Sequence, residues 1–123
     1  MKSKKKLVIS VDFDGSMVKN EWPLIGDLRF GAVSVLRWLK RRGHSLILNT
    51  CREGRLLKPI IDIHWGDYGI QFDHVNENTP ERIRQYGGDC RKISADWYID
   101  DRAGFLGWWS IPFIILWLER TQL

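Results

Sequence analysis

Carboxylates follow directly after short apolar segments at two places far apart in this 123-residue chain. The four residues are Asp12, Asp14, Asp100 and Asp101. Four carboxylates at one site repel one another unless a cation neutralises them, and a set of oxygen ligands suits Mg²⁺. Thr50 follows a third apolar segment and can donate a hydrogen bond to a phosphate oxygen, while Lys92 can offset the negative charge of a phosphate. These residue types predict magnesium-dependent chemistry on a phosphate group.

Apolar segments and helical patterns alternate along the chain and must position these residues. Apolar runs predict strands over residues 7–11, 45–49, 72–75 and 97–99. Helical spacing and start signals predict helices over residues 31–42, over residues 53–68, from residue 79, and over residues 112–120. This alternation is typical of a parallel sheet covered on both faces, with ligands bound beyond the carboxyl ends of its strands. We therefore expect an α/β, Rossmann-like three-layer fold whose sheet edge gathers the polar residues.

Two segments are harder to interpret. Residues 16–27 contain Trp22-Pro23 and are expected to form an irregular loop or small flap, from which Trp22 could contact substrate. Pro59 lies inside the second helical pattern and predicts a kink or a split there. Four tryptophans are expected in the core, and Trp108 and Trp109 fit either core packing or an oligomer contact. The four expected in the core are Trp38, Trp65, Trp97 and Trp117.

Composition favours one globular domain over residues 1–123, with 44% hydrophobic and 28% charged residues. The net charge of +4 resides in four lysines of the segment 2–6, since the remaining 15 Lys and Arg match 15 Asp and Glu. Residues 1–6 are therefore expected to form a flexible basic tail, through which nucleic acid is a conceivable but not favoured partner. The longest apolar run, 105–118, is shorter than the ~20 residues of a membrane span, and two isolated cysteines suit a reducing cytoplasm.

The polar positions occur in the order of four motifs of the haloacid-dehalogenase-like (HAD) hydrolase superfamily. The segments that resemble the motifs are Val11-Asp12-Phe13-Asp14-Gly15-Ser16, then Leu48-Asn49-Thr50, then Lys92, then Tyr98-Ile99-Asp100-Asp101. Ser16 stands where the first motif more commonly has Thr, and Arg91 could serve in place of Lys92. The ordered set spans most of the chain, so the resemblance is much more specific than one Asp-x-Asp pair.

This resemblance implies a Mg²⁺-dependent phosphomonoesterase and a role for each residue. Asp12 would be the nucleophile that forms an aspartyl-phosphate, and Asp14 would protonate the leaving alcohol and then activate water. Mg²⁺ would be held by the Asp12 carboxylate, the Asp14 backbone carbonyl and the acidic pair, with Asp101 the favoured direct ligand and Asp100 in support. Two further residues would hold the phosphate oxygens, Thr50 and Lys92.

The spacing leaves no room for a large cap domain, so we expect a small capless enzyme with an open site. In the family, such sites often serve phosphorylated proteins or nucleic-acid ends, unless an oligomeric neighbour closes them. The substrate is therefore left open between a small molecule and a macromolecular end.

Other functions are compatible with parts of the sequence. In a receiver-type phosphoacceptor domain the acidic pair comes first and the phosphorylated Asp later, which is the reverse of the order here. A non-catalytic binding module, associated with nucleic acid through Lys2–Lys6, would not need both Asp12 and Asp14. Phosphoryl transfer to an acceptor other than water is not distinguished from hydrolysis by the sequence.

Overall fold

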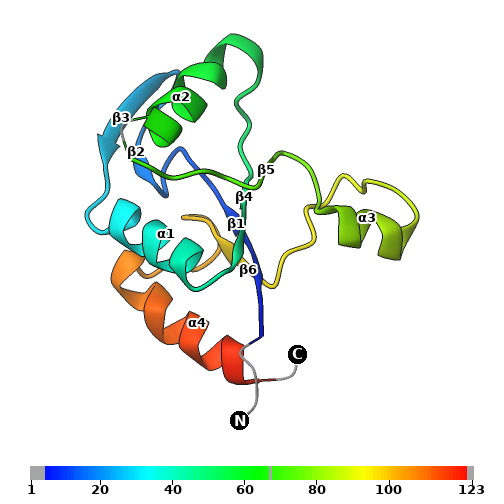
Figure 1. Ribbon diagram of the computed structural model, residues 1–123. Coiled ribbons are helices and arrows are strands. Elements are labelled where there is room, and N and C mark those ends of the chain that lie inside the picture. The colour runs from blue at the N-terminus through cyan, green and yellow to red at the C-terminus, as the bar shows by residue number, and fades with distance from the viewer. Residues whose placement is uncertain (1–4, 67, 122–123) are drawn as a thin grey trace.

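A four-stranded sheet forms the centre of the molecule in the computed structural model, which describes residues 5–66 and 68–121, residues 63–66 by backbone alone (Figure 1). Its strands lie in the order β5-β4-β1-β6, and every neighbouring pair is parallel. The strands are β1 (Val8–Val11), β4 (Ser45–Leu48), β5 (His74–Val75) and β6 (Trp97–Ile99). The prediction of an α/β, Rossmann-like fold with a central parallel sheet is confirmed.

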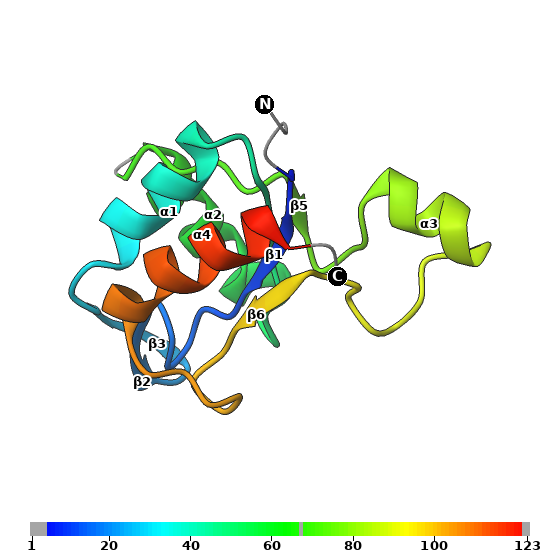
Figure 2. The same cartoon turned by 90° about the horizontal axis from the view of Figure 1, so that it is seen from below.

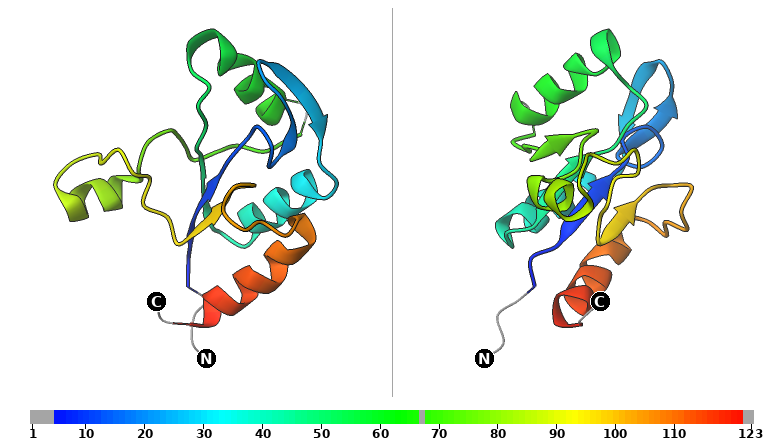
Figure 3. Two further views of the ribbon diagram at one scale, coloured as in Figure 1. Left: turned by 180° about the vertical axis from the view of Figure 1, so that it is seen from behind. Right: turned by 90° about the vertical axis from the view of Figure 1, so that its right-hand side faces the viewer.

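Helices flank the two faces of this sheet unequally. The α-helices are α1 (Ala32–Arg41), α2 (Lys58–Gly66), α3 (Pro80–Tyr86) and α4 (Ile111–Arg120). Figures 1 and 2 show α1, α2 and α4 on one face, whereas α3 projects from the other. The right-hand view of Figure 3 looks onto the sheet from the side of α3. The main hydrophobic core therefore lies between the sheet and the helices of the first face.

Helical spacing in the sequence determines which sides of α1 and α4 are buried. The buried residues recur at intervals of three or four, so that each helix presents one apolar side to the core. They are Ala32, Leu36 and Leu39 of α1 and Ile111, Ile115 and Leu118 of α4. Trp117 lies on the opposite side of α4 and is exposed, so its predicted core position is wrong. Trp38 and Trp97 pack at the border of the core, and the side chain of Trp65 lies outside the described residues.

The segment expected to be irregular is a β-hairpin. β2 (Val18–Glu21) pairs antiparallel with β3 (Leu24–Leu28), and the two form a separate sheet beside the carboxyl edge of the main one. Only Val18 of β2 is buried, because most hairpin side chains face solvent. Weak apolar alternation of this kind carries little strand signal in the sequence. The hairpin forms a flap, as predicted, but a regular one.

Pro59 has the effect that its position predicts. A 3₁₀ turn, η1 (Gly54–Leu56), precedes α2, and Pro59 is the second residue of that helix. In the first turn its missing N–H has no helical partner to lose, so the helix begins there instead of at residue 53. In α3 the Thr79 hydroxyl oxygen accepts a hydrogen bond from the Arg82 N–H at 3.3 Å, as predicted for a cap.

An ion-pair cluster holds the opposite, amino edge of the sheet. Glu119 of α4 is buried and accepts hydrogen bonds from Arg42 Nη2 at 2.5 Å and Arg42 Nε at 2.8 Å. His44 Nε2 lies 2.7 Å from Glu119 Oε2, and His44 Nδ1 accepts from the Leu7 N–H at 3.0 Å. Arg42 holds the pKa of Glu119 well below its usual value, at about 2. Burial lowers the pKa of His44, although Glu119 opposes that effect.

The basic amino terminus is only partly described. Residues 1–4, with two of the lysines of the expected tail, lie outside the described residues. Lys6 Nζ donates to the Arg42 carbonyl oxygen at 2.8 Å, and the Lys5 N–H donates to the Glu119 carbonyl oxygen at 3.4 Å. Lys5 and Lys6 thus contact the folded chain, unlike the flexible tail that we expected. Within the described ranges, no helix is both long and apolar enough to span a membrane.

Candidate functional site

Three of the four predicted carboxylates converge at the carboxyl edge of the sheet. Val11 pairs with Leu48 on one side and with Ile99 on the other, so the residues that follow these strands emerge at one level. The Asp12 N–H donates to the Ile99 carbonyl oxygen at 2.9 Å, which fixes the exit of β1 beside that of β6. Asp12, Asp100 and Asp101 each place one carboxylate oxygen within 4.8 Å of the others. Among the described residues they form a compact acidic cluster.

Ser16 connects two of these carboxylates from a fully buried position. Its Oγ lies 3.0 Å from Asp12 Oδ2 and 3.2 Å from Asp101 Oδ1, and it accepts a hydrogen bond from the Asp101 N–H at 2.8 Å. A hydroxyl has one proton, so it can donate to only one of the two carboxylates at a time. Ser16 therefore holds the pair close together without neutralising it.

Gly15 allows the close approach of Asp101 to the turn after β1. Its φ is +94°, a conformation that costs an L side chain energy. A Cβ at this position would lie 2.6 Å from Asp101 Oδ2, which is too close for any side chain. Two features therefore require a glycine after the Asp-x-Asp pair: the positive φ of the turn and the Asp101 carboxylate that packs against it.

The surroundings of Asp12 disfavour its ionised form. Among the described residues, no salt bridge involves Asp12, Asp100 or Asp101. Burial, together with the neighbouring carboxylates of Asp101 and Asp100, raises the pKa of Asp12 to about 7, although the hydrogen bond from Ser16 lowers it in part. Burial and mutual repulsion thus destabilise the ionised form of Asp12, and a cation bound between the carboxylates would stabilise that form.

Asp14 is placed differently from the other three acids. Both of its carboxylate oxygens accept hydrogen bonds from Arg52, at 2.7 Å from Nη2 and 2.8 Å from Nε. The Arg52 side chain is buried, and this two-pronged geometry is the strongest form of a carboxylate–guanidinium pair. Asp14 therefore has a fixed orientation at the pocket, and its carboxylate belongs to an ion pair instead of the acidic cluster.

Arg52 also anchors the flap over the site. Its Nη1 donates to the Pro23 carbonyl oxygen at 3.1 Å, and its Nη2 donates to the Leu24 carbonyl oxygen at 3.0 Å. The Trp22 ring packs over the guanidinium, with 5.0 Å between the ring centre and Arg52 Cζ. One side chain thus joins the end of β1, the tip of the hairpin and the segment after β4. Nothing in the sequence indicated these partners of Arg52.

Thr50 lies at the pocket with its hydroxyl proton available. Its N–H donates to Asn76 Oδ1 at 2.8 Å, and its Oγ1 accepts from the Arg52 N–H at 3.1 Å. None of the described residues accepts a hydrogen bond from this hydroxyl. Thr50 can therefore donate its O–H to a ligand, whereas its own N–H is already used by Asn76.

Lys92 does not line the pocket. Its side chain is exposed on the segment between α3 and β6, and its carbonyl oxygen accepts a hydrogen bond from Asn78 Nδ2 at 3.1 Å. The segment follows α3, which projects away from the carboxyl edge of the sheet (Figure 1). The cation that does line the pocket is Arg102, whose N–H also donates to Asp100 Oδ1 at 2.9 Å.

The pocket formed by these residues has a volume of about 360 Å³. Besides the four acids, Thr50 and Arg102, its wall includes Asn20 and Trp22 of the flap and Cys51. No spacing pattern indicated Asn20 or Cys51, because they reach the pocket only through the fold of the hairpin and the turn after β4. The flap position of Trp22 did indicate such a contact.

The donor set fits a hard divalent cation. The three clustered carboxylates provide oxygen ligands, and Mg²⁺ is commonly held by one or two carboxylates together with water or phosphate oxygens. A cation between them would also offset the repulsion that raises the Asp12 pKa.

No protein-family model matches the sequence, and no curated protein matches it. A solved structure of a conserved protein coded by a locus of Bacteroides thetaiotaomicron is similar over 95% of this chain and 94% of that chain, with 36% sequence identity and a TM-score of 0.78. Identity at this level over nearly the full length of both chains indicates common descent. The chain belongs to the same family as this conserved Bacteroides protein.

Proposed function

We propose that the chain is a Mg²⁺-dependent phosphomonoesterase that uses Asp12 as its nucleophile. The observation that best supports this function is the convergence of Asp12, Asp100 and Asp101 at the carboxyl edge of a parallel sheet, with no salt bridge to them among the described residues. Ligands of such folds bind at this edge. The resemblance of four ordered motifs to the HAD hydrolases supports the same reaction.

Three residues would hold the cation: Asp12, Asp100 and Asp101, with the Asp14 backbone carbonyl as a further ligand. When bound, Mg²⁺ supplies positive charge to the phosphoryl oxygens and to the acidic cluster. The favoured direct ligand of the acidic pair is Asp101, because Ser16 and Gly15 fix its carboxylate beside that of Asp12.

In the first step a carboxylate oxygen of Asp12 attacks phosphorus and the bond from phosphorus to the ester oxygen breaks. Asp14, protonated at a lone pair that Arg52 does not use, gives this proton to the departing alcohol, and the Asp12 side chain becomes an aspartyl-phosphate. In the second step Asp14 takes a proton from water, the water oxygen attacks phosphorus, and inorganic phosphate leaves while the Asp12 carboxylate is restored.

Arg52 gives Asp14 the orientation that these proton transfers need. Each Asp14 oxygen accepts one hydrogen bond from Arg52 and keeps a second lone pair for water or the leaving oxygen. The Thr50 hydroxyl donates to a phosphate oxygen, and Arg102 supplies the positive charge that Lys92 was expected to provide.

The test is turnover of an aryl phosphate with Mg²⁺ and with EDTA, by wild-type protein and by Asp12→Asn. We expect metal-dependent turnover that Asp12→Asn lowers by several orders of magnitude, as for other essential nucleophiles. Asp62→Asn, which changes an exposed acid of α2 outside the pocket, is the matched control and should keep wild-type rates. Folded protein that neither turns over the ester nor retains beryllofluoride with Mg²⁺ would refute the proposal.

A further inference from the structure

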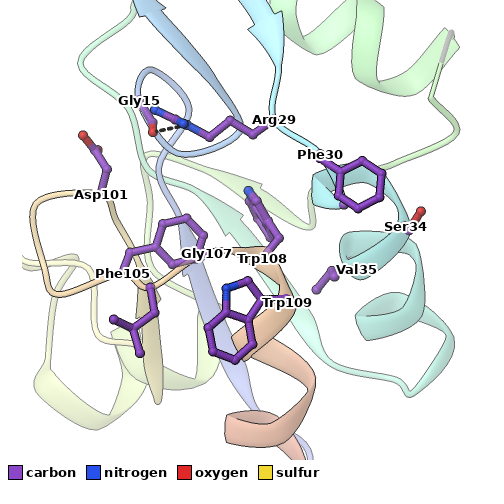
Figure 4. A pocket seen from close by; sticks show the side chains of 12 residues that line it. Gly15, Arg29, Phe30, Ser34, Val35, Asp101, Phe105, Gly107, Trp108 and Trp109 are labelled. Carbon is purple, nitrogen blue, oxygen red and sulfur yellow. Dashed lines mark hydrogen bonds between the residues drawn. The ribbon is translucent and has the colours of Figure 1, made fainter.

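A second cavity lies beside the acidic pocket, between the start of α1 and the segment that leads from β6 into α4 (Figure 4). Its volume is about 620 Å³, within the ~300–1,000 Å³ typical of small-molecule sites. Ring and aliphatic side chains form most of its wall, whereas polar groups are few. The apolar residues of the wall are Phe30, Val35, Phe105, Leu106, Trp108 and Trp109. Such a lining favours a flat, apolar group.

Two adjacent tryptophans have different places in this cavity. Trp108 is buried, and its ring stands edge-on to that of Phe105 with 5.6 Å between the ring centres. Trp109 is largely exposed, and its indole packs so closely on Gly107 that a Cβ there would lie 2.9 Å from the ring. The buried inner ring fixes the wall of the cavity, and the exposed outer ring of Trp109 provides a face on which an aromatic ligand can stack.

The second cavity and the acidic pocket are parts of one region. Asp101 lines both, and Gly15, which packs against its carboxylate, also lines the second cavity. Trp108 Nε1 donates to the Ser16 carbonyl oxygen at 2.8 Å, and the Ser16 hydroxyl contacts Asp12 and Asp101. A substrate with its phosphate at Asp12 therefore has this apolar cavity beside its alcohol portion.

Arg29 gives the cavity a positive charge. Its Nε donates to the Gly15 carbonyl oxygen at 2.7 Å, the dashed contact in Figure 4. No salt bridge among the described residues involves Arg29. The positive charge of Arg29 complements the negative charge of a phosphate ester bound next to Asp101. A neutral apolar ligand would make no use of this charge.

We propose that this cavity, which we call the ring pocket, binds the aromatic part of the substrate. The substrate class is then a phosphomonoester whose alcohol carries a flat, fused aromatic ring. This inference rests on the proposed phosphatase function and gives it a substrate preference. Stacking on Trp109 adds to the affinity for such an alcohol, and Arg29 attracts its phosphate.

Two substrates with the same type of leaving group test the preference. 2-(2-Naphthyl)ethyl phosphate and ethyl phosphate are both primary alkyl esters, so they differ mainly in the ring. We expect a higher kcat/KM for the naphthyl ester, and Trp109→Ala should lower the ratio of the two kcat/KM values by about fivefold to tenfold. Trp117→Ala is the matched control, because Trp109 and Trp117 expose 68% and 58% of their surface but only Trp109 lines the cavity. An equal ratio in all three proteins would overturn the ring pocket.

Binding of the product alcohol tests the pocket without any chemistry. With EDTA present, 2-(2-naphthyl)ethanol should shift the NMR signal of the Trp109 indole N–H, assigned by its loss in Trp109→Phe. It should bind Trp109→Ala about fivefold to tenfold more weakly than Trp117→Ala. Binding of the alcohol, together with no turnover of either ester and no retention of beryllofluoride with Mg²⁺, would refute the phosphatase and leave the ring pocket standing.

Absence of that binding would overturn the ring pocket even if both esters were hydrolysed. Sedimentation then identifies the alternative occupant. A wild-type dimer that Trp109→Ala dissociates, together with no binding of the alcohol, would assign this apolar face to a second copy of the chain.

Discussion

Two acids at opposite edges of the same sheet have opposite environments. Glu119, at the amino edge, lies against Arg42 and His44, and its pKa falls to about 2. Asp12, at the carboxyl edge, lies against Asp101 and Asp100, and burial with these neighbours raises its pKa to about 7. The chain neutralises one acid with its own residues, whereas the other acid has no salt-bridge partner among the described residues. An uncompensated acid at a ligand-binding edge is therefore a better mark of function than an acid that is merely buried.

The two acids also give opposite dependences of stability on pH. The folded pKa of Glu119 is depressed, so its contribution is present above its unfolded value of 4.5 and is lost as the pH falls to about 2. The folded pKa of Asp12 is raised, so without a cation it costs stability increasingly as the pH rises from 3.8 to about 7.

Removing the paired acid should have the largest effect. Glu119→Ala leaves Arg42 without its ion-pair partner and the buried His44 Nε2 without its hydrogen-bond partner, and we expect a loss of about 3–5 kcal/mol in the free energy of unfolding at pH 7. Urea denaturation measures this loss, with Glu77→Ala, an exposed acid, as the control. A loss below about 1 kcal/mol would mean that the amino edge does not depend on this pair.

Displacing an unpaired acid should have a smaller effect on stability and a large one on function. Gly15→Ala places a methyl group against the Asp101 carboxylate, and we expect a loss of about 2–3 kcal/mol together with loss of turnover. Gly87→Ala is the control, because its φ is also positive, +75°, but nothing lies within 4 Å of the added carbon. It should cost about 1 kcal/mol and keep turnover. Equal effects of the two variants on turnover would contradict the placement of Asp101.

Neutralising the unpaired acid should stabilise the protein. Asp12→Asn removes a charge that is repelled by two carboxylates, so we expect a gain of about 1–2 kcal/mol at pH 8 in EDTA. Mg²⁺ should stabilise the wild type and leave Asp12→Asn nearly unchanged. Thermal unfolding with and without Mg²⁺ measures both effects, and a destabilised Asp12→Asn would contradict the repulsion.

The acidic cluster was predictable because Asp12 and the acidic pair each follow a strand directly. Parallel strands end at one edge, so the predicted strands alone place these residues together. The partners of Arg52 were not predictable, because they come from the turn after β1 and the tip of the flap. Those contacts arise only when the hairpin folds over the segment after β4.

Lys92 and Trp117 lie elsewhere than predicted, because their positions also depend on how the chain folds. Lys92 was assigned to the site by its position before β6, but the chain leaves the sheet through α3 (Figure 1), and no residue between α3 and β6 is among those that line the pocket. Trp117 was assigned to the core because it is large and apolar, whereas the spacing of Ile111, Ile115 and Leu118 puts it on the other side of α4. The helical spacing of apolar residues thus predicted burial in α4 better than residue type did.

Above all, we propose that the acidic cluster of Asp12, Asp100 and Asp101 binds a cation. The most direct test is titration of the side-chain carboxyls of Asp12 and Glu119 by ¹³C NMR. In EDTA we expect Asp12 to titrate near 7 and Glu119 near 2. With Mg²⁺ the Asp12 transition should move down by more than one pH unit, about 1.4 kcal/mol, while that of Glu119 stays in place. An Asp12 that titrates near 4 in EDTA, or that does not respond to Mg²⁺, would contradict an acidic cluster built to hold the ion.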